Sequence, residues 1–327
     1  WETPEFQRQL RLLKVLKETG AHVNVCMGPW TNSQMRQDGM ERTGVDVVKY
    51  LRNKQGFDNI RWLTLFNEPD TLYYHDSPLY DRLFKDRRNP EQRPWADYVS
   101  KHRETQEMLA SEGLYPAVRL VVGDTVWGYQ MRRERLGMCA RDFGDLDVNY
   151  GYHHYAAHFP KFYGEGESDF KPPPMVEETR ICRELVGPDA ELVVWEFNNA
   201  GYGFGTAFPG TGPYGEDFIG TVENGVILAD KVMTGLANGL DGMALWCVCD
   251  MFYASGLQQG VMYFGLWRYK WQHWTPRPNY YYYAALMHAF PPGCQLHAVD
   301  TGHPALTGLA AKQDGRWTVA LVNCMDV

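Results

Sequence analysis

The sequence predicts an α/β fold: a (β/α)8 or TIM barrel whose first two strands are absent, followed by part of a small antiparallel β-domain. Short apolar runs without regular alternation recur along the chain, as in strands buried on both faces of a parallel sheet. A helical pattern follows each run, and this strand–helix alternation is typical of parallel α/β proteins. From Cys294 onward the period changes to short alternating runs, which indicates antiparallel strands.

The elements are expected in a regular order. The first helix begins at Thr3-Pro4-Glu5, where Thr is an N-cap residue and Pro occupies the first turn. We expect the other helices at about residues 45–54, 95–112, 130–141, 175–186, 218–238 and 280–290. We expect the parallel strands at about residues 21–30, 60–68, 117–124, 147–155, 191–199 and 242–250. Six such strands are two short of a closed eight-stranded barrel.

The chain begins at Trp1 with neither an initiator Met nor a signal peptide, and it begins in a helix signal. We therefore interpret it as N-terminally truncated, with the missing strand pair before Trp1, and expect this piece alone to fold poorly and to be inactive. Its compartment cannot be judged from a leader. A doubly wound open sheet is the alternative architecture, but its glycine-rich phosphate loop is not found after the first strand.

Two domains are expected. Residues 1–292 form the catalytic barrel, and residues 293–327 begin a C-terminal domain of the β-sandwich type. In the second domain the runs QLHAV, LTGLAAK and WTVALVN alternate in polarity and are separated by Gly, Asp and Pro, as in antiparallel strands.

Composition excludes several classes of function. With 44% hydrophobic and 22% charged residues and a net charge of -8, the chain is an ordinary globular protein without the basic face that nucleic acids require. No apolar run reaches the ~18 residues that would cross a membrane. The seven cysteines lack zinc-type spacing, so we expect buried free thiols and a weak preference for a reducing compartment.

Two of the predicted strands end beside a glutamate. The run IRWLTLFNEPD leads to Glu68, and the run ELVVWEFNN leads to Glu196. The carboxyl ends of parallel strands are where barrel enzymes place their chemistry. Glycosidic bond cleavage requires two carboxyl groups, one acid and one nucleophile or base, so this pair predicts a glycosidase. The 14% aromatic content fits either a sugar cleft or a large core with Tyr at its boundary.

Four motifs occur in order along the chain: FNEPD at 66–70, HHY at 153–155, VVWEFN at 193–198 and ALWCVCD at 244–250, with Phe264-Gly265-Leu266 and Pro278-Asn279-Tyr280 after them. Together they resemble the clan A glycoside hydrolases, which are retaining enzymes on a (β/α)8 barrel. The closest similarity is to the β-xylosidase/α-L-iduronidase family, and it covers about residues 21–292.

The resemblance implies the role of each catalytic residue. Glu68 is the acid/base, with a pKa raised by burial and by the charge of Glu196, and Glu196 is the nucleophile. In a retaining enzyme the two carboxyl groups lie about 5–5.5 Å apart. Asn67 holds the sugar 2-hydroxyl, although an Asn in this position also suits a turn cap.

The remaining site residues follow from the same resemblance. Tyr155 supports the nucleophile with its hydroxyl, and His153 is its partner unless it is a core histidine. Trp246 forms the floor of the subsite, while Trp30, Trp127 and Asn198 are rim residues. His154 is expected to face the helices. The loop aromatics Tyr73, Tyr74, Trp267, Trp271 and Trp274 are further candidates for shaping the cleft.

The predicted function is a retaining glycosidase that cleaves a β-linked oligo- or polysaccharide and needs no cofactor. A metal site is not expected, because His153, His154 and His158 lack an HExxH or comparable pattern. Two alternatives stay open: a carbohydrate-binding pseudoenzyme on the same barrel, and a barrel enzyme of different chemistry such as a metal-dependent isomerase or lyase. Nucleic-acid and membrane partners are not expected.

Overall fold

The structure is a computed structural model, and the described residues are 3–28, 39–75, 77–78, 81, 92–126, 129–156, 175–199, 219–253 and 260–324. The chain divides into two compact units. The first comprises Trp1–Trp127, Met131–Tyr152 and Leu185–Glu191, and the second comprises Gly128–Gln130, His153–Glu184 and Leu192–Val327. Each unit is described by itself.

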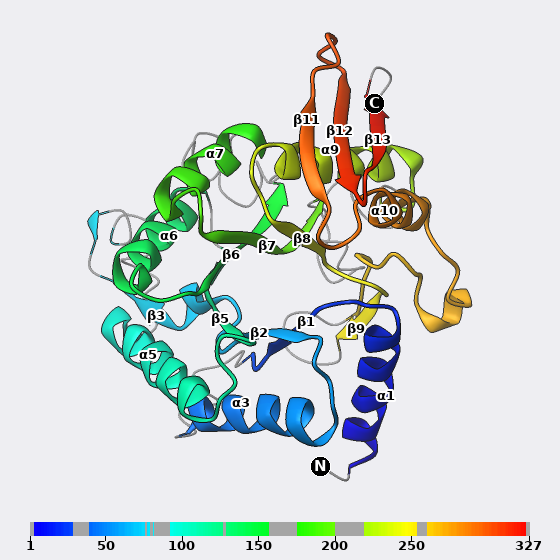
Figure 1. Cartoon of the computed structure of the whole chain (residues 1–327). Coiled ribbons are helices and arrows are strands. Elements are labelled where there is room, and N and C mark those ends of the chain that lie inside the picture. The colour runs from blue at the N-terminus through cyan, green and yellow to red at the C-terminus, as the bar shows by residue number, and fades with distance from the viewer. Residues whose placement is uncertain are drawn as a thin grey trace. The chain divides into compact units, whose positions relative to one another are not determined.

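The main sheet has six strands in the order β1-β2-β5-β6-β7-β8 (Figure 1). Their bounds are Val23–Cys26 for β1, Ile60–Thr64 for β2, Arg119–Thr125 for β5, Asn149–Ala156 for β6, Glu191–Asn199 for β7 and Gly242–Leu245 for β8. The pairings described for β1/β2, β2/β5, β5/β6 and β7/β8 are all parallel. A curved parallel sheet with a helix after each strand is part of a (β/α)8 barrel, which confirms the predicted fold class.

In the first unit the helices are α1 (Pro4–Glu18), α3 (Met40–Lys49), α5 (Trp95–Ser111) and α6 (Tyr129–Phe143), and α3 continues into a π-helical turn, Tyr50–Lys54. The Thr3 hydroxyl accepts a hydrogen bond from the Phe6 N–H, as expected of an N-cap. Helix α3 begins before the expected residue 45, because Gly39 at φ 93° starts it in a left-handed conformation. Val45 and Val48 of α3 are fully buried.

The second unit contains α7 (Met175–Val186), α9 (Val222–Ala237), α10 (Pro278–Ala289) and the hairpin of β9 (Met251–Tyr253) with β10 (Gly260–Met262). Its C-terminal part is an antiparallel sheet of β11 (Gln295–Val299), β12 (Leu306–Gln313) and β13 (Arg316–Asn323). Leu309, Ala311 and Val322 are buried on one face of this sheet, which contacts α9 and α10 (Figure 1). These three strands confirm the predicted change of period, whereas the boundary between residues 292 and 293 stays a prediction.

Two strands end earlier than predicted. Sheet pairing of β2 stops at Thr64, before Glu68, and β8 stops at Leu245, so that Cys247 and Cys249 lie beyond the strand. All seven cysteines are free, as predicted, but of these only Cys139, Cys182 and Cys247 are buried and Cys26 is exposed. Among the helices that the structure describes, none is both long and apolar enough to cross a membrane.

Candidate active site

In the first unit Glu68 lies in a tight turn after β2. The chain leaves the sheet at Thr64, but Leu65 and Phe66 remain buried, so the apolar run continues past the end of the strand. Glu68 has φ 50° and ψ 56°, a left-handed conformation, and the 3-10 turn Pro69–Thr71 follows it. Such a conformation costs a non-glycine residue about 1–3 kcal/mol and is concentrated at functional sites.

Asp70 fastens this turn to the end of β5. Its carboxylate accepts hydrogen bonds from the Thr125 hydroxyl at 2.6 Å and from the Val126 N–H at 2.8 Å. The Arg135 Nε atom lies 3.6 Å from the same carboxylate, and both side chains are 1% exposed. Arg135 also lies over the Trp95 ring at 4.7 Å. The backbone at Glu68 is therefore held by a buried charge two residues away.

Asn67 is 7% exposed, and its Nδ2 atom has no hydrogen-bond partner within the described part of the chain. A buried amide donor without a partner costs about 1–3 kcal/mol. An acceptor such as a hydroxyl would satisfy it. The geometry is therefore compatible with the predicted contact to a sugar hydroxyl, which stays a prediction.

In the second unit Glu196 lies on β7 beside two side chains of β6. The Tyr155 hydroxyl donates a hydrogen bond to Glu196 Oε2 at 2.8 Å, and His153 Nδ1 lies 3.4 Å from the same oxygen. The Glu196 side chain is 13% exposed and His153 is fully buried. Since side chains alternate along a strand, His153 and Tyr155 share one face and His154 takes the other. His154 contacts Glu178 of α7 at 2.9 Å, which confirms that it faces the helices.

Trp246 follows β8 directly, and its peptide bond to Cys247 is cis. Its N–H donates to the Phe197 carbonyl at 3.0 Å. The Trp246 and Tyr155 side chains pack against a buried cluster of Ile219, Cys247, Met262 and Phe264. Burial raises the pKa of the Cys247 thiol, so this cysteine is neutral and contributes packing rather than nucleophilicity.

Asn198 is fully buried, and its amide Nδ2 donates to the carbonyls of Trp246 and Phe264. Both amide hydrogens are thus used to hold the backbone beyond β8. Its predicted role as a rim residue stays untested, and its observed contacts are structural. Trp30 and Trp127 lie outside the described residues.

A buried ion pair that the sequence analysis did not predict lies in the chain beyond β8. Arg277 donates to both carboxylate oxygens of Asp250, at 2.8 and 2.7 Å, and both side chains are 0% exposed. Asp250 also accepts from the Gly265 N–H at 2.9 Å, and Arg277 donates to the Gly265 carbonyl. A Cβ at position 265 would collide with the Asp250 and Trp267 backbones, so only glycine fits between Phe264 and Leu266.

The loop aromatics divide into buried and exposed residues. Tyr73 is fully buried, with its ring 5.4 Å from Phe66 and 5.3 Å from Tyr98, so it belongs to the core of the first unit and not to a cleft wall. Trp271 and Trp274 are about half exposed.

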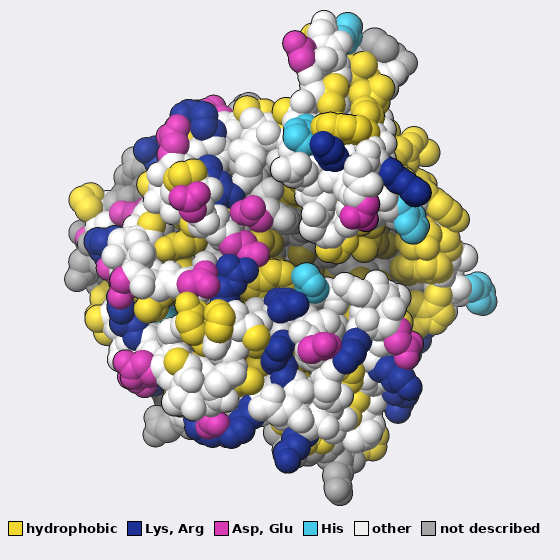
Figure 2. Space-filling view, in the orientation of Figure 1, with side chains coloured by type: hydrophobic (Ala, Val, Ile, Leu, Met, Phe, Trp, Pro, Cys, Tyr) yellow, Lys and Arg dark blue, Asp and Glu magenta, His cyan; other side chains and the backbone are white. Residues whose placement is uncertain are grey.

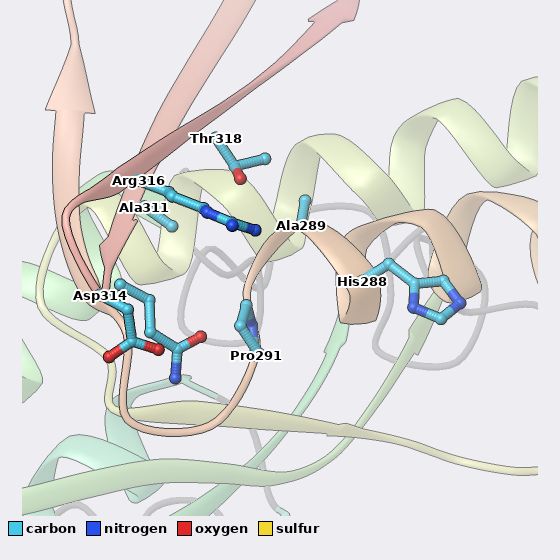
Figure 3. Close-up of a pocket in the computed structure, with 8 residues that line it drawn as sticks. His288, Ala289, Pro291, Ala311, Asp314, Arg316 and Thr318 are labelled. Carbon is cyan, nitrogen blue, oxygen red and sulfur yellow. The ribbon is translucent and has the colours of Figure 1, made fainter.

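The second unit also contains a cavity of about 500 Å³ between the end of α10 and the β12–β13 hairpin (Figure 3). The Arg316 side chain extends across it toward Ala289, and His288 and Asp314 contribute polar groups (Figure 3).

Comparisons with known proteins identify the fold. No protein-family model matches the sequence, and no curated protein does. Among solved structures, SrfJ from Salmonella typhimurium is similar with a TM-score of 0.56 and 11% identity, covering 88% of this chain and 56% of that one. AbfB, a family 51 α-L-arabinofuranosidase from Bifidobacterium longum, has a TM-score of 0.55 and 14% identity, covering 95% and 63%. The GH39 enzyme from Xanthomonas axonopodis pv. citri has a TM-score of 0.51 and 16% identity, covering 87% and 52%.

The GH39 enzyme and the family 51 α-L-arabinofuranosidase are clan A glycoside hydrolases, and the chain has the fold of these neighbours. This confirms the predicted resemblance at the level of the fold. The chain spans less than two thirds of the length of the three neighbours named. Glu68 belongs to the first unit and Glu196 to the second. The expectation that their carboxyl groups face each other therefore stays a prediction.

Proposed function

We propose that the protein is a retaining glycoside hydrolase that cleaves a β-glycosidic bond in an oligo- or polysaccharide. The observation that supports this best is the environment of Glu196. On a fold shared with glycosidases, a mostly buried carboxylate near the carboxyl end of a parallel strand accepts a hydrogen bond from a tyrosine hydroxyl. A carboxylate that accepts this hydrogen bond is kept ionised and oriented, as a nucleophile must be.

The reaction has two steps. In the first, a Glu196 oxygen bonds to the anomeric carbon while the glycosidic C–O bond breaks, and Glu68 gives its proton to the departing oxygen. In the second, Glu68 takes a proton from water, the water oxygen bonds to the anomeric carbon, and the bond to Glu196 breaks. Each glutamate regains its starting protonation state, so no cofactor enters the balance. This mechanism requires the two carboxyl groups to lie about 5–5.5 Å apart.

Three further residues receive proposed roles. The Asn67 amide donates to the sugar 2-hydroxyl, and its Nδ2 atom, buried without a partner in the described chain, supports this. His153, 3.4 Å from Glu196 Oε2, helps to fix the orientation of the nucleophile. Trp246, at the end of β8, offers an apolar ring face to the sugar.

The neighbours suggest which sugars to test first. Their descriptions name an α-L-arabinofuranosidase, a β-glycosidase and GH30 xylanase C, in each case with identity of 14% or less. Nitrophenyl glycosides of xylose, arabinose and glucose are therefore the first panel. If the protein hydrolyses none of these glycosides and neither xylan nor cello-oligosaccharides, the alternative of a carbohydrate-binding pseudoenzyme is favoured.

Substitution of Glu196 tests the mechanism. Glu196→Gln should lower kcat by about 10⁴-fold or more, as expected when the reacting group of a covalent mechanism is lost. Glu196→Ala opens space for azide, which should restore part of the turnover and yield a glycosyl azide. Glu184→Gln, an exposed glutamate of α7, is the control and should retain full activity. Turnover that survives Glu196→Gln would end the assignment.

Glu68→Gln tests the acid. This change should reduce hydrolysis of substrates with poor leaving groups far more than hydrolysis of activated aryl glycosides, because only the former need a proton on the departing oxygen. Equal losses on both kinds of substrate would show that Glu68 is not the acid.

A further inference from the structure

Asn198 joins the strand that carries Glu196 to the residue that follows β8. It lies on β7 two positions after Glu196, and its side chain is fully buried. On the face shown in Figure 2, side chains of both charges are exposed to solvent, as is usual for polar groups of a globular protein. Burial of an amide is costly unless its donors and acceptor are used. The partners of the Asn198 amide therefore show what its burial stabilises.

The register of β7 against β8 changes next to Glu196. Val194 pairs with Met243 and Phe197 pairs with Leu245, so β7 contains one residue more than β8 in this interval. Glu196 lies within the interval. Irregular pairing of this kind redirects side chains and is common beside active sites. Directly after it, β8 ends at Leu245.

Both main-chain groups of Trp246, the residue after β8, are bound by β7. The Trp246 N–H donates to the Phe197 carbonyl at 3.0 Å, and the Trp246 carbonyl accepts from the Asn198 amide. The Asn198 side chain thus continues the pairing of the two strands by one residue after β8 has ended.

A second hydrogen bond fixes the plane of the Asn198 amide, because Nδ2 also donates to the Phe264 carbonyl at 3.1 Å. That carbonyl accepts from the Cys247 N–H as well, and the Leu266 N–H donates to the Cys247 carbonyl at 3.0 Å. The amide is therefore held between the segment after β8 and the segment after β10. Both of its hydrogens are used by main-chain carbonyls and neither is left for a sugar.

The direction of the Trp246 ring depends on this main-chain anchor. Trp246 is partly exposed, and its side chain packs beside Tyr155 against the buried cluster that contains Phe264. Close packing restricts the rotamers of the ring, so a shift of the Trp246 main chain moves the ring relative to Glu196. A misplacement of about 1 Å in a site of this kind can cost about 10²-fold in rate.

We propose that Asn198 is a positioning residue: its amide fixes Trp246 against β7, so that the indole ring and the Glu196 carboxylate keep the relative placement that one sugar unit requires. This inference rests on the proposed function, which it deepens by giving Asn198 a role through Trp246 in place of direct contact with the sugar. A leucine of similar volume would fill the same space but would remove the donor from the Trp246 carbonyl.

A double-mutant cycle tests this role. It compares kcat/KM on the best aryl glycoside for the parent, Asn198→Leu, Trp246→Ala and the double variant. Asn198→Leu should lower kcat/KM about 10- to 100-fold in the parent but less than about threefold in the Trp246→Ala protein, since no ring is left to position. Asn198→Asp has nearly the same shape and no N–H donor, and it should give the same pattern if the leucine variant does not fold.

Asn59→Leu is the matched control. Asn59 is a buried asparagine directly before β2 in the first unit, and its amide donates to the Ala21 carbonyl at 2.8 Å. Its replacement should lower the Tm, as Asn198→Leu does, because a buried carbonyl loses its donor. It should nevertheless keep kcat/KM within about twofold of the parent, which separates positioning from stability.

Equal losses from Asn198→Leu in the parent and in the Trp246→Ala protein would overturn the positioning role, and so would an unchanged kcat/KM. If the parent hydrolyses no glycoside, the proposed function fails, and the same cycle is measured by isothermal titration with xylobiose and cellobiose. A loss of affinity in Asn198→Leu that disappears in the Trp246→Ala protein would then retain the role. Binding of neither disaccharide by the parent would overturn the role together with the function.

Discussion

The two predicted catalytic glutamates are positioned by different kinds of interaction. Glu196 is held directly, because the Tyr155 hydroxyl donates to its carboxylate at 2.8 Å from the neighbouring strand. Glu68 is held through its backbone, since it occupies a strained turn that Asp70 fastens to the end of β5. A nucleophile must keep its carboxylate aimed at one carbon atom. An acid/base must exchange a proton with two partners in turn, and a fixed backbone position brings its side chain to the same place for both transfers.

Each unit also contains a buried Asp–Arg pair, and the two pairs differ in geometry. Arg277 binds Asp250 through two parallel hydrogen bonds and is fully buried with it. Arg135 approaches Asp70 only to 3.6 Å, and its Nε and Nη1 have no hydrogen-bond partner within the described residues. The Asp70 carboxylate depends instead on Thr125 and Val126. The second unit thus relies on a bidentate ion pair where the first relies on neutral donors.

Arg277→Met has the largest expected effect on the free energy of unfolding. It leaves the Asp250 carboxylate buried without its counterion, which typically costs 3–5 kcal/mol of unfolding free energy, so we expect a loss of about that size. Urea denaturation followed by circular dichroism measures it. Arg180→Met removes an exposed pair with Glu184 on α7 and should cost less than about 1 kcal/mol.

The same replacement in the first unit sharpens the comparison. Arg135→Met should cost less than Arg277→Met, about 2 kcal/mol, because Asp70 keeps its bonds from Thr125 and Val126 and because methionine fills the space over Trp95. Equal losses at the two positions would show that the pairs are equivalent and that the contrast between the units is wrong.

Acid should destabilise the first unit through His102. His102 is buried among Tyr98, Phe66 and Phe143, and this burial lowers its pKa to about 4 from the usual 6.5. The unfolded chain therefore binds a proton at His102 below about pH 6.5, whereas the folded chain binds this proton only below about pH 4. Stability should fall as the pH drops through this window, by about 3 kcal/mol at most.

A variant isolates this contribution. Urea denaturation between pH 4 and 7 should show a shallower loss of stability for His102→Leu than for the parent. His303→Leu, at an exposed histidine after β11, should follow the parent curve. Parallel curves for His102→Leu and the parent would contradict the assignment.

Much of the fold follows from sequence periodicity, because burial on one or both faces leaves a direct trace in the order of apolar residues. QLHAV, for example, coincides with β11. The ends of strands are harder to predict from the sequence. Leu65 and Phe66 are as apolar as β2 and stay buried after the chain has left the sheet, so the apolar run overestimates the strand. Glu68 consequently lies in a turn and not at the strand tip.

The contacts behind the site were not predictable from one sequence. Arginine usually indicates a solvated surface, so nothing marked Arg135 or Arg277 as buried. Their partners Asp70 and Asp250 are distant in sequence, and only the folded backbone brings them together. Asn198 illustrates the same limit, because the carbonyls that accept from its amide belong to Trp246 and Phe264, beyond the next strand.

Tyr155→Phe tests the comparison between the two glutamates most directly. The change removes a single hydrogen bond to a charged group, worth about 1.5–3 kcal/mol, so kcat should fall about ten- to a hundredfold while KM changes little. Thr125→Val removes a hydroxyl bond to Asp70 at the other glutamate and should lower kcat less, because the Val126 N–H still holds the turn. Steady-state kinetics on the best aryl glycoside measures both variants. If Thr125→Val were the more damaging change, direct side-chain support of Glu196 would not be the stronger requirement, and the distinction between the two glutamates would have to be abandoned.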